Sequence, residues 1–142
     1  MGKINISRWL LGGIVAGIVG DLIGYLVDGV WLAPRWANGM SALGHSSTFT
    51  SHQLIWFNVL GIVAGLTAVW IYAAIRPRFG AGVMTAVYAG IAAWILAVVI
   101  PNSAFMCVDG LFSKHLALYT TIGALFEYVV GTVIGAWLYQ EK

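Results

Sequence analysis

Asp21 and Glu127 are acidic residues that stand in the middle of long apolar stretches. Each is accompanied, at intervals of three or four residues, by glycines that would lie on the same side of a helix. The glycines around Asp21 are Gly13, Gly17, Gly20 and Gly24, and those around Glu127 are Gly123, Gly131 and Gly135. Small residues at this spacing let two helices approach closely inside a membrane. We therefore expect both acids to face a neighbouring helix near the middle of a bilayer.

The composition indicates an integral membrane protein. The 142 residues are 61% hydrophobic and only 8% charged, whereas soluble proteins carry about 25% charged residues. At about 20 residues per span, the length accommodates four membrane helices and leaves no room for a soluble domain. The formal net charge of +2 comes from basic residues at the ends of the apolar stretches. It therefore does not indicate a nucleic-acid partner, which would require a basic patch.

The pattern predicts an all-α fold, an integral membrane four-helix bundle that forms a single transmembrane domain over residues 1–142. The helices are expected at about residues 9–32, 54–75, 83–100 and 116–138, and the longer loops at 33–53 and 101–115. Pro34 and Pro101 are expected to end the helices that precede them. The segment 76–80 contains Pro77 and Gly80, which is typical of a tight turn.

The basic residues predict how the helices are oriented in the membrane. One side of the membrane would carry Lys3, Arg8, Arg76, Arg78 and Lys142, and the other side would carry Arg35 and Lys114. Because cytoplasmic segments are enriched in Lys and Arg, both termini are expected to be cytoplasmic. The loops 33–53 and 101–115 would then face outward, and Trp31 and Trp36 would suit a short interfacial helix in the first of them.

Further polar residues connect the central acids to the predicted outer surface. At a rise of 1.5 Å per residue, Asp28 and Asn58 would each lie about one turn inside the outer end of their helix. Tyr25 would lie between this level and the level of Asp21. The sequence therefore predicts an outward-facing polar pocket, with Asp21 and Glu127 as its floor and the other polar residues along its approach.

An acid inside a membrane is expensive and is a functional candidate. No Lys or Arg lies at the predicted depth of Asp21 or Glu127. The two acids could be protonated and hydrogen-bonded to Tyr, Thr or backbone carbonyls, and would then act as neutral fasteners between helices. Alternatively, they could bind a proton, a metal ion or an organic amine from outside, or they could dock a partner's helix.

Small residues line one face of every predicted helix. The glycines assigned to helix packing are Gly13, Gly17, Gly61, Gly65, Gly90, Gly131 and Gly135. Four such faces offer more packing surface than one bundle uses, so we expect a homo-oligomer or a larger membrane complex. The first functional hypothesis is transport or ligand binding linked to a proton or cation. The alternative is a structural or accessory subunit that packs through its glycine-rich faces.

Metal, cofactor and enzyme chemistry have little support in the sequence. His45, His52 and His115 lie in or beside the outer loops and are the only candidates for a metal or haem ligand set, but their spacing matches no motif. Cys107 is the only cysteine, so no intramolecular disulfide can form. No Gly-x-Ser-x-Gly motif or phosphate-binding loop is present. No cofactor is predicted, and an enzyme or electron carrier at the histidines is the third hypothesis.

Three sequence blocks carry a resemblance to a known group of proteins. They are Ala68-Val69-Trp70-Ile71-Tyr72-Ala73-Ala74-Ile75-Arg76-Pro77-Arg78-Phe79-Gly80, Gly12-Gly13-x2-Ala16-Gly17 and Gly135-Ala136-Trp137-Leu138-Tyr139. With these blocks, the whole chain resembles a group of short bacterial membrane proteins without assigned function. The resemblance implies a bacterial four-helix protein, multi-pass in the cytoplasmic (inner) membrane, and it implies no activity.

Overall fold

The computed structural model describes residues 4–141, and these residues form helices and connecting loops with no strand. The elements are α1 (Ile6–Gly24), η1 (Tyr25–Trp31), α2 (Ala33–Ala42), α3 (Ser51–Phe79), α4 (Val83–Trp94), η2 (Ile95–Val99), α5 (Ile100–Met106) and α6 (Lys114–Leu138). The segments η1 and η2 are π-helical, and each continues the α-helix before it. Four continuous stretches are long and apolar enough to cross a membrane, namely Ile6–Trp31, Ser51–Phe79, Val83–Met106 and Lys114–Leu138. The all-helical prediction with four membrane-length helices is confirmed.

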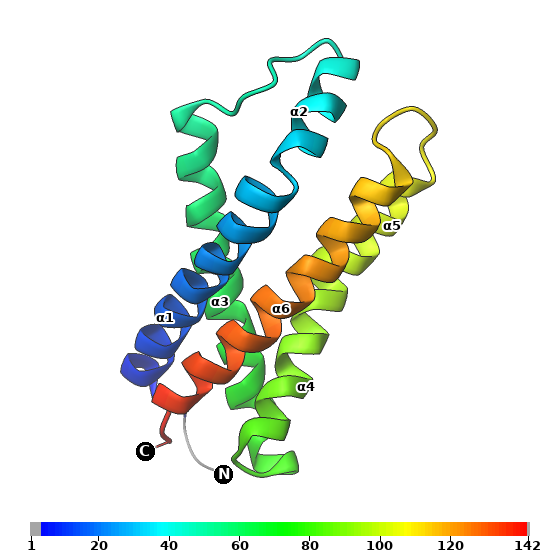
Figure 1. Cartoon of the computed structure of the whole chain (residues 1–142). Helices are drawn as coiled ribbons and strands as arrows, with labels where there is room; N and C mark the ends of the chain where they lie inside the picture. The colour runs from blue at the N-terminus through cyan, green and yellow to red at the C-terminus, as the bar shows by residue number, and fades with distance from the viewer. Residues whose placement is uncertain (1–3, 142) are drawn as a thin grey trace.

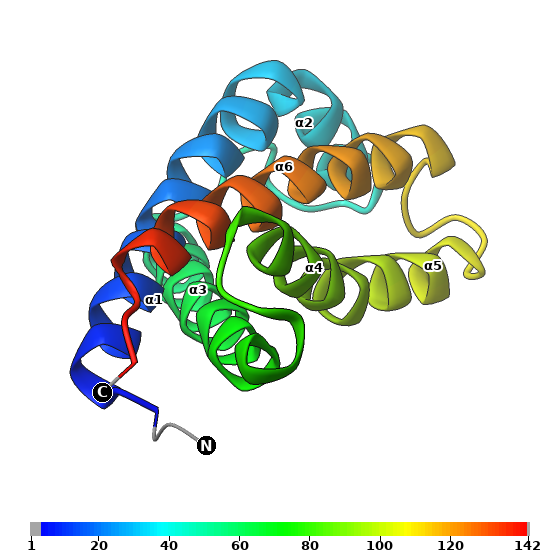
Figure 2. The same cartoon turned by 90° about the horizontal axis from the view of Figure 1, so that it is seen from below.

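The four long helices are arranged so that α1 and α4 each pack against both α3 and α6. In Figure 2, α3 and α6 lie between α1 and α4. In Figure 1, the start of α1, the end of α6 and the turn between α3 and α4 lie together at one end, which we call the lower end. The loops that follow α2 and α5 lie at the opposite, upper end (Figure 1).

The buried core lies at the lower end and is built mainly from alanine. Its buried members are Ala16, Val69, Tyr72, Ala73, Ala86, Ala89, Ala136 and Tyr139. The Trp9 indole N–H ties α1 to α3 by donating to the Leu66 carbonyl at 2.8 Å. Every residue of the first ten in α3, from 51 to 60, is exposed. The helices are therefore closely packed at the lower end, and α3 extends away from its neighbours at the upper end (Figure 1).

The turn predicted at residues 76–80 is wrong, because α3 continues through Pro77 to Phe79. Pro77 has no N–H to donate to the carbonyl four residues before it, and the helix ends two residues later at Phe79. The reversal follows at Gly80 and Gly82, whose φ angles of +85° and +153° are accessible to glycine. The Gly80 N–H closes the helix by donating to the Arg76 carbonyl at 2.9 Å.

The expectation that Pro101 ends its helix is also wrong, because the helix runs on to Met106. The π-helical segment η2 precedes the proline, and the Ile100 N–H donates to the Ile95 carbonyl, five residues back. A wider turn relieves the clash between a proline ring and the preceding turn. The loop predicted at 101–115 is therefore reduced to residues 107–113.

The first predicted outer loop contains a short helix, as Trp31 and Trp36 suggested. This helix, α2, has Pro34 in its first turn, where a missing N–H carries no cost. Another π-helical segment, η1, precedes it, and the Leu32 N–H donates to the Val27 carbonyl at 2.8 Å. Pro34 therefore both follows the first membrane helix and starts α2.

α1 carries two adjacent lines of small residues, one through Gly13 and Gly17 and the other through Ala16. They allow two helices to approach its backbone closely. Gly65 of α3 packs on one line, where a Cβ atom would lie 2.5 Å from the Gly13 oxygen and 2.7 Å from the Gly17 Cα. Gly131 of α6 packs on the other line, where a Cβ atom would lie 2.7 Å from the Ala16 oxygen. No side chain larger than hydrogen fits at these crossings.

The two faces of α1 can be tested with a matched pair of substitutions. A Cβ at Gly17 would lie 2.5 Å from the Ile62 Cα. A Cβ at Gly20 would lie 3.7 Å from its nearest neighbour, the backbone carbonyl oxygen of Glu127. Both changes to alanine improve helix propensity by about 1 kcal/mol. We expect Gly17→Ala to lower the free energy of unfolding by about 1–3 kcal/mol because it overpacks the crossing. We expect Gly20→Ala to be neutral or stabilising. Unfolding in detergent measures both, and equal effects would contradict the packing described.

Candidate functional site

Asp21 lies on α1 and directs its carboxylate toward α3. The carboxylate occupies the space beside Gly61, and a Cβ atom at Gly61 would overlap it. The glycine is therefore what makes room for the acid between the two helices. The Asp21 side chain is half-buried, and the prediction that it faces a neighbouring helix is confirmed.

Glu127 lies on α6 and directs its carboxylate toward α1. A Cβ atom at Gly24 would lie 3.2 Å from Glu127 Oε2 and 3.5 Å from Oε1. The Oε1 atom is buried and has no hydrogen-bond partner among the described residues. The two central acids therefore lie on different sides of α1: Asp21 belongs to α1 and points toward α3, and Glu127 belongs to α6 and points toward α1.

Asp28 in η1 makes a defined hydrogen bond to α2. Its Oδ1 atom accepts from the indole Nε1 of Trp36 at 2.9 Å. This bond holds α2 over the upper end of α1 and fixes the orientation of the Trp36 ring. Asp28 therefore has a structural role in the chain, alongside any contribution to binding.

Tyr25 and Asn58 do not join these acids. Tyr25 is 65% exposed, and its ring packs back over Gly29 of its own helix. Asn58 is exposed, and its amide donates to the Leu54 carbonyl in α3 at 2.7 Å. The expectation that Asn58 faces the neighbouring helices is not met, because α3 extends past them at this level. Asp21, Asp28 and Glu127 thus each lie at a separate contact of the first membrane helix, Asp21 beside Gly61, Asp28 at Trp36 and Glu127 beside Gly24.

None of these acids is balanced by a basic side chain. The one ion pair found within residues 4–141 joins Arg76 to Glu141 at 3.5 Å, at the lower end. A charge removed from water without a partner is very costly. An ionised carboxylate at these half-buried positions therefore carries a desolvation cost, which protonation or a bound cation would offset.

The histidines lie on the surface of the described part of the chain. His45, His52 and His115 are exposed, and His52 accepts a hydrogen bond from the Trp56 indole at 3.1 Å. In the part of the chain that the structure describes, no group of three or more His, Cys, Asp or Glu side chains could hold a metal ion. Cys107 is also exposed.

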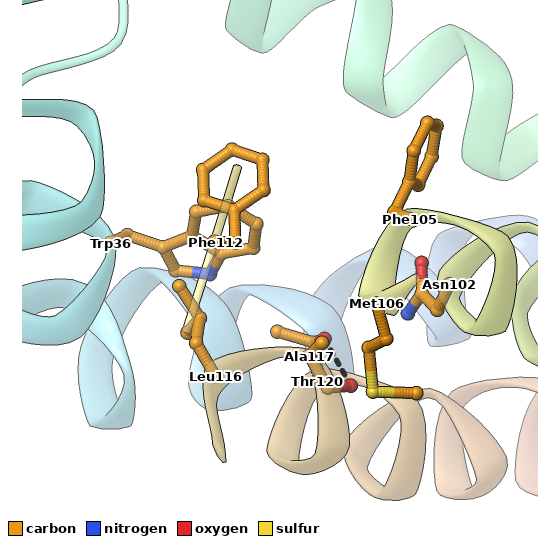
Figure 3. Close-up of a pocket in the computed structure, with 8 residues that line it drawn as sticks. All are labelled: Trp36, Asn102, Phe105, Met106, Phe112, Leu116, Ala117 and Thr120. Carbon is orange, nitrogen blue, oxygen red and sulfur yellow. Dashed lines mark hydrogen bonds between the residues drawn. The ribbon is translucent and has the colours of Figure 1, made fainter. Parts of the chain in front are cut away.

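A cavity at the upper end was not predicted from the sequence. We call it the upper cavity; it has a volume of about 170 Å³ and lies between α2, α5 and α6. Figure 3 shows Trp36 and Phe112 on one side of it, and Asn102, Phe105 and Met106 on the other. An open apolar groove of about 440 Å³ lies between α3 and the α4–η2 helix. The three acids line neither space.

The site therefore offers three half-buried acids that lack a basic partner, held between helices that meet through glycine.

We compared the chain with protein-family models, with curated proteins and with solved structures, and it matches none of them.

The Asp28–Trp36 bond can be tested by replacing the acceptor. Asp28→Leu removes the acceptor, whereas Asp28→Asn keeps a side-chain oxygen at the same place. In a ¹⁵N-labelled sample, we expect the Trp36 indole N–H signal to move upfield in Asp28→Leu and to stay close to its position in Asp28→Asn, because a lost hydrogen bond increases proton shielding. The Trp94 indole donates to the Thr121 carbonyl at 2.8 Å and is the internal control. Identical Trp36 signals in the two variants would mean that the bond is not formed.

Proposed function

We propose that this protein is a bacterial inner-membrane four-helix bundle that binds a proton or a small cation at Asp21 and Glu127, with Asp28 along the approach. Binding at these acids would serve transport or ligand binding. The observation that supports this most strongly is the buried Glu127 Oε1, which lacks a hydrogen-bond partner among the described residues beside Gly24. An unpartnered buried oxygen is uncommon in folded proteins and needs a physical reason.

Binding at Glu127 would change the packing of α1 against α6. The carboxylate of Glu127 lies against the backbone of α1 at Gly24, with no side chain between them. A change from a neutral to an ionised carboxyl, or the arrival of a cation, therefore alters the contact between α1 and α6 directly. Since the same face of α1 continues down to Gly12, where it meets Gly135 of α6, this contact can transmit the change along both helices.

Access from the upper end is favoured by the packing. The lower end is filled by the alanine-rich core, and the edge-on rings of Tyr72 and Tyr139, 6.0 Å apart, lie within it. At the upper end α3 extends away from its neighbours (Figure 1). With the termini on the cytoplasmic side, as the basic residues predict, a proton or cation would enter from outside.

Assembly into a homo-oligomer is part of this proposal. The upper part of α3 exposes large apolar side chains, among them Leu54, Ile55, Trp56 and Phe57. A second copy could cover this surface and would enclose more volume than one chain can.

The same surface supports the alternative of an accessory subunit in a larger membrane complex. The glycine faces offer less support for it, because Gly13, Gly17, Gly65, Gly131 and Gly135 are already buried within the chain. A partner would therefore have to bind to the upper part of α3. Solubilisation from the native membrane with a stable partner, in place of a homo-oligomer, would favour this alternative.

The proposal is tested by neutralising the acids and following stability against pH. Ionising a buried carboxyl that has no partner costs free energy, so we expect the unfolding midpoint of the wild type to fall as pH rises. Glu127→Gln should remove most of this dependence, and Asp21→Asn should remove a smaller part. The control is Glu141→Gln, since Glu141 is paired with Arg76 away from the site.

The same samples give the oligomeric state by cross-linking in detergent at low and high pH. If Glu127→Gln and Asp21→Asn both keep the wild-type pH profile and the wild-type oligomer, the acids are neutral fasteners and the proposal fails.

A further inference from the structure

The upper cavity has the dimensions of a binding site for one ring. Its volume of about 170 Å³ is close to that of an engineered apolar cavity of about 150 Å³ that takes up benzene. In Figure 3, Trp36 and Phe112 face Met106 and Phe105 across the space. Flat aromatic walls and a polarisable sulfur suit a flat aromatic guest.

The walls are held in place by hydrogen bonds and ring contacts. The Trp36 indole is bonded to Asp28 and lies edge-on to Phe112, with ring centroids 5.5 Å apart. On the other wall, Asn102 Nδ2 donates to Thr121 Oγ1 at 2.9 Å. A site whose side chains are already fixed loses little conformational entropy when a ligand binds.

The polar groups of the lining favour a neutral ligand that donates a hydrogen bond. No charged side chain lines the cavity, so an ion would lose its hydration without compensation. Thr120 Oγ1 already donates to the Ala117 carbonyl at 3.0 Å, and the indole N–H of Trp36 and one of the two amide N–H groups of Asn102 are also engaged as donors. The lone pairs of Thr120 Oγ1 and Asn102 Oδ1 remain for a ligand.

We propose that the upper cavity binds a neutral molecule with a single aromatic ring and a hydroxyl donor, that is, a compound of the phenol class. The ring would lie between Trp36 and Met106, and the hydroxyl would donate to Thr120 Oγ1. This inference goes beyond the proposed function, because it does not depend on the charge of Asp21 or Glu127.

The test uses the full-length ¹⁵N-labelled protein in lipid nanodiscs, titrated with phenol and, separately, with toluene. The chain has seven tryptophans, so each indole N–H reports on one place. We expect phenol to move the Trp36 signal saturably. Trp137 is 86% exposed near the end of α6, and its signal should show only the linear change caused by partition into lipid.

Two substitutions with matched controls locate the ligand. Ala117→Leu fills the floor of the cavity and should weaken phenol binding by about tenfold or more, whereas Leu118→Met on the exposed side of α6 should leave it unchanged. Thr120→Val removes the acceptor and should reduce the preference for phenol over toluene, expected at about three- to tenfold, to none. Its control is Thr67→Val, since Thr67 makes a similar bond to the Val63 carbonyl, away from this cavity.

The proposal is overturned if phenol causes no saturable movement of the Trp36 signal, or if toluene binds as tightly as phenol. It is also overturned if Ala117→Leu binds phenol normally while its other indole signals are unchanged. If Ala117→Leu disturbs those other signals, the variant has perturbed the fold, and the comparison of Thr120→Val with Thr67→Val decides the matter.

Discussion

The close approach of two helices to the backbone of α1 is the constraint on which the rest of the structure depends. Gly65 of α3 and Gly131 of α6 each pack on a line of small residues, and at each crossing an added Cβ would collide with backbone atoms of α1. Inside a membrane, where lipid is as apolar as the side chains, such contacts stabilise helix association through dispersion and close fit. Helices this close leave space for a carboxylate only where glycine stands opposite, as Gly61 does for Asp21 and Gly24 does for Glu127.

The same helices carry different residues at their contacts toward the lower end and toward the upper end. At the lower end, alanine and glycine close the contact completely, and the core includes Tyr72 and Tyr139. Toward the upper end the same faces carry acids, and the helices begin to separate. The acids therefore lie at the boundary between the closely packed lower end and the more open upper end. The π-helical segments η1 and η2 both lie above this boundary, and π-helical turns are frequent at functional sites.

The regular spacing of apolar residues and glycines predicted the features that repeat along a helix. The long apolar stretches predicted the four membrane-length helices, and the glycine spacing predicted that Asp21 and Glu127 face other helices. The prediction was less accurate for residues that were assigned to the pocket from their expected depth in the membrane. Asn58 and Tyr25 were assigned to the pocket because of their level in the membrane, but α3 extends past its neighbours there and Tyr25 points outward.

Two other features have no signal in a one-dimensional pattern. Proline is a reliable sign of a helix end only when the preceding turn cannot adapt, and the π-helical turn before Pro101 allows the helix to continue. The upper cavity is formed by side chains from α2, α5, α6 and the loop at 107–113. Such a space depends on how separate segments meet, and the only trace of it in the sequence is the aromatic content of the segments 33–53 and 101–115.

The position of the Glu127 carboxylate against α1 is the central claim, and a carbon–carbon correlation spectrum in lipid bilayers tests it most directly. Glutamate and glycine would be ¹³C-labelled in a Glu141→Gln background, which leaves Glu127 as the only glutamate. We expect a short-range cross-peak between the Glu127 Cδ and a glycine Cα. We expect it to disappear in Gly24→Ala, because Gly24 lies beside the Glu127 Cδ and this variant has no labelled Cα at that position. If the spectrum has no such cross-peak, or if it persists in Gly24→Ala, Glu127 does not lie against α1 and the account is contradicted.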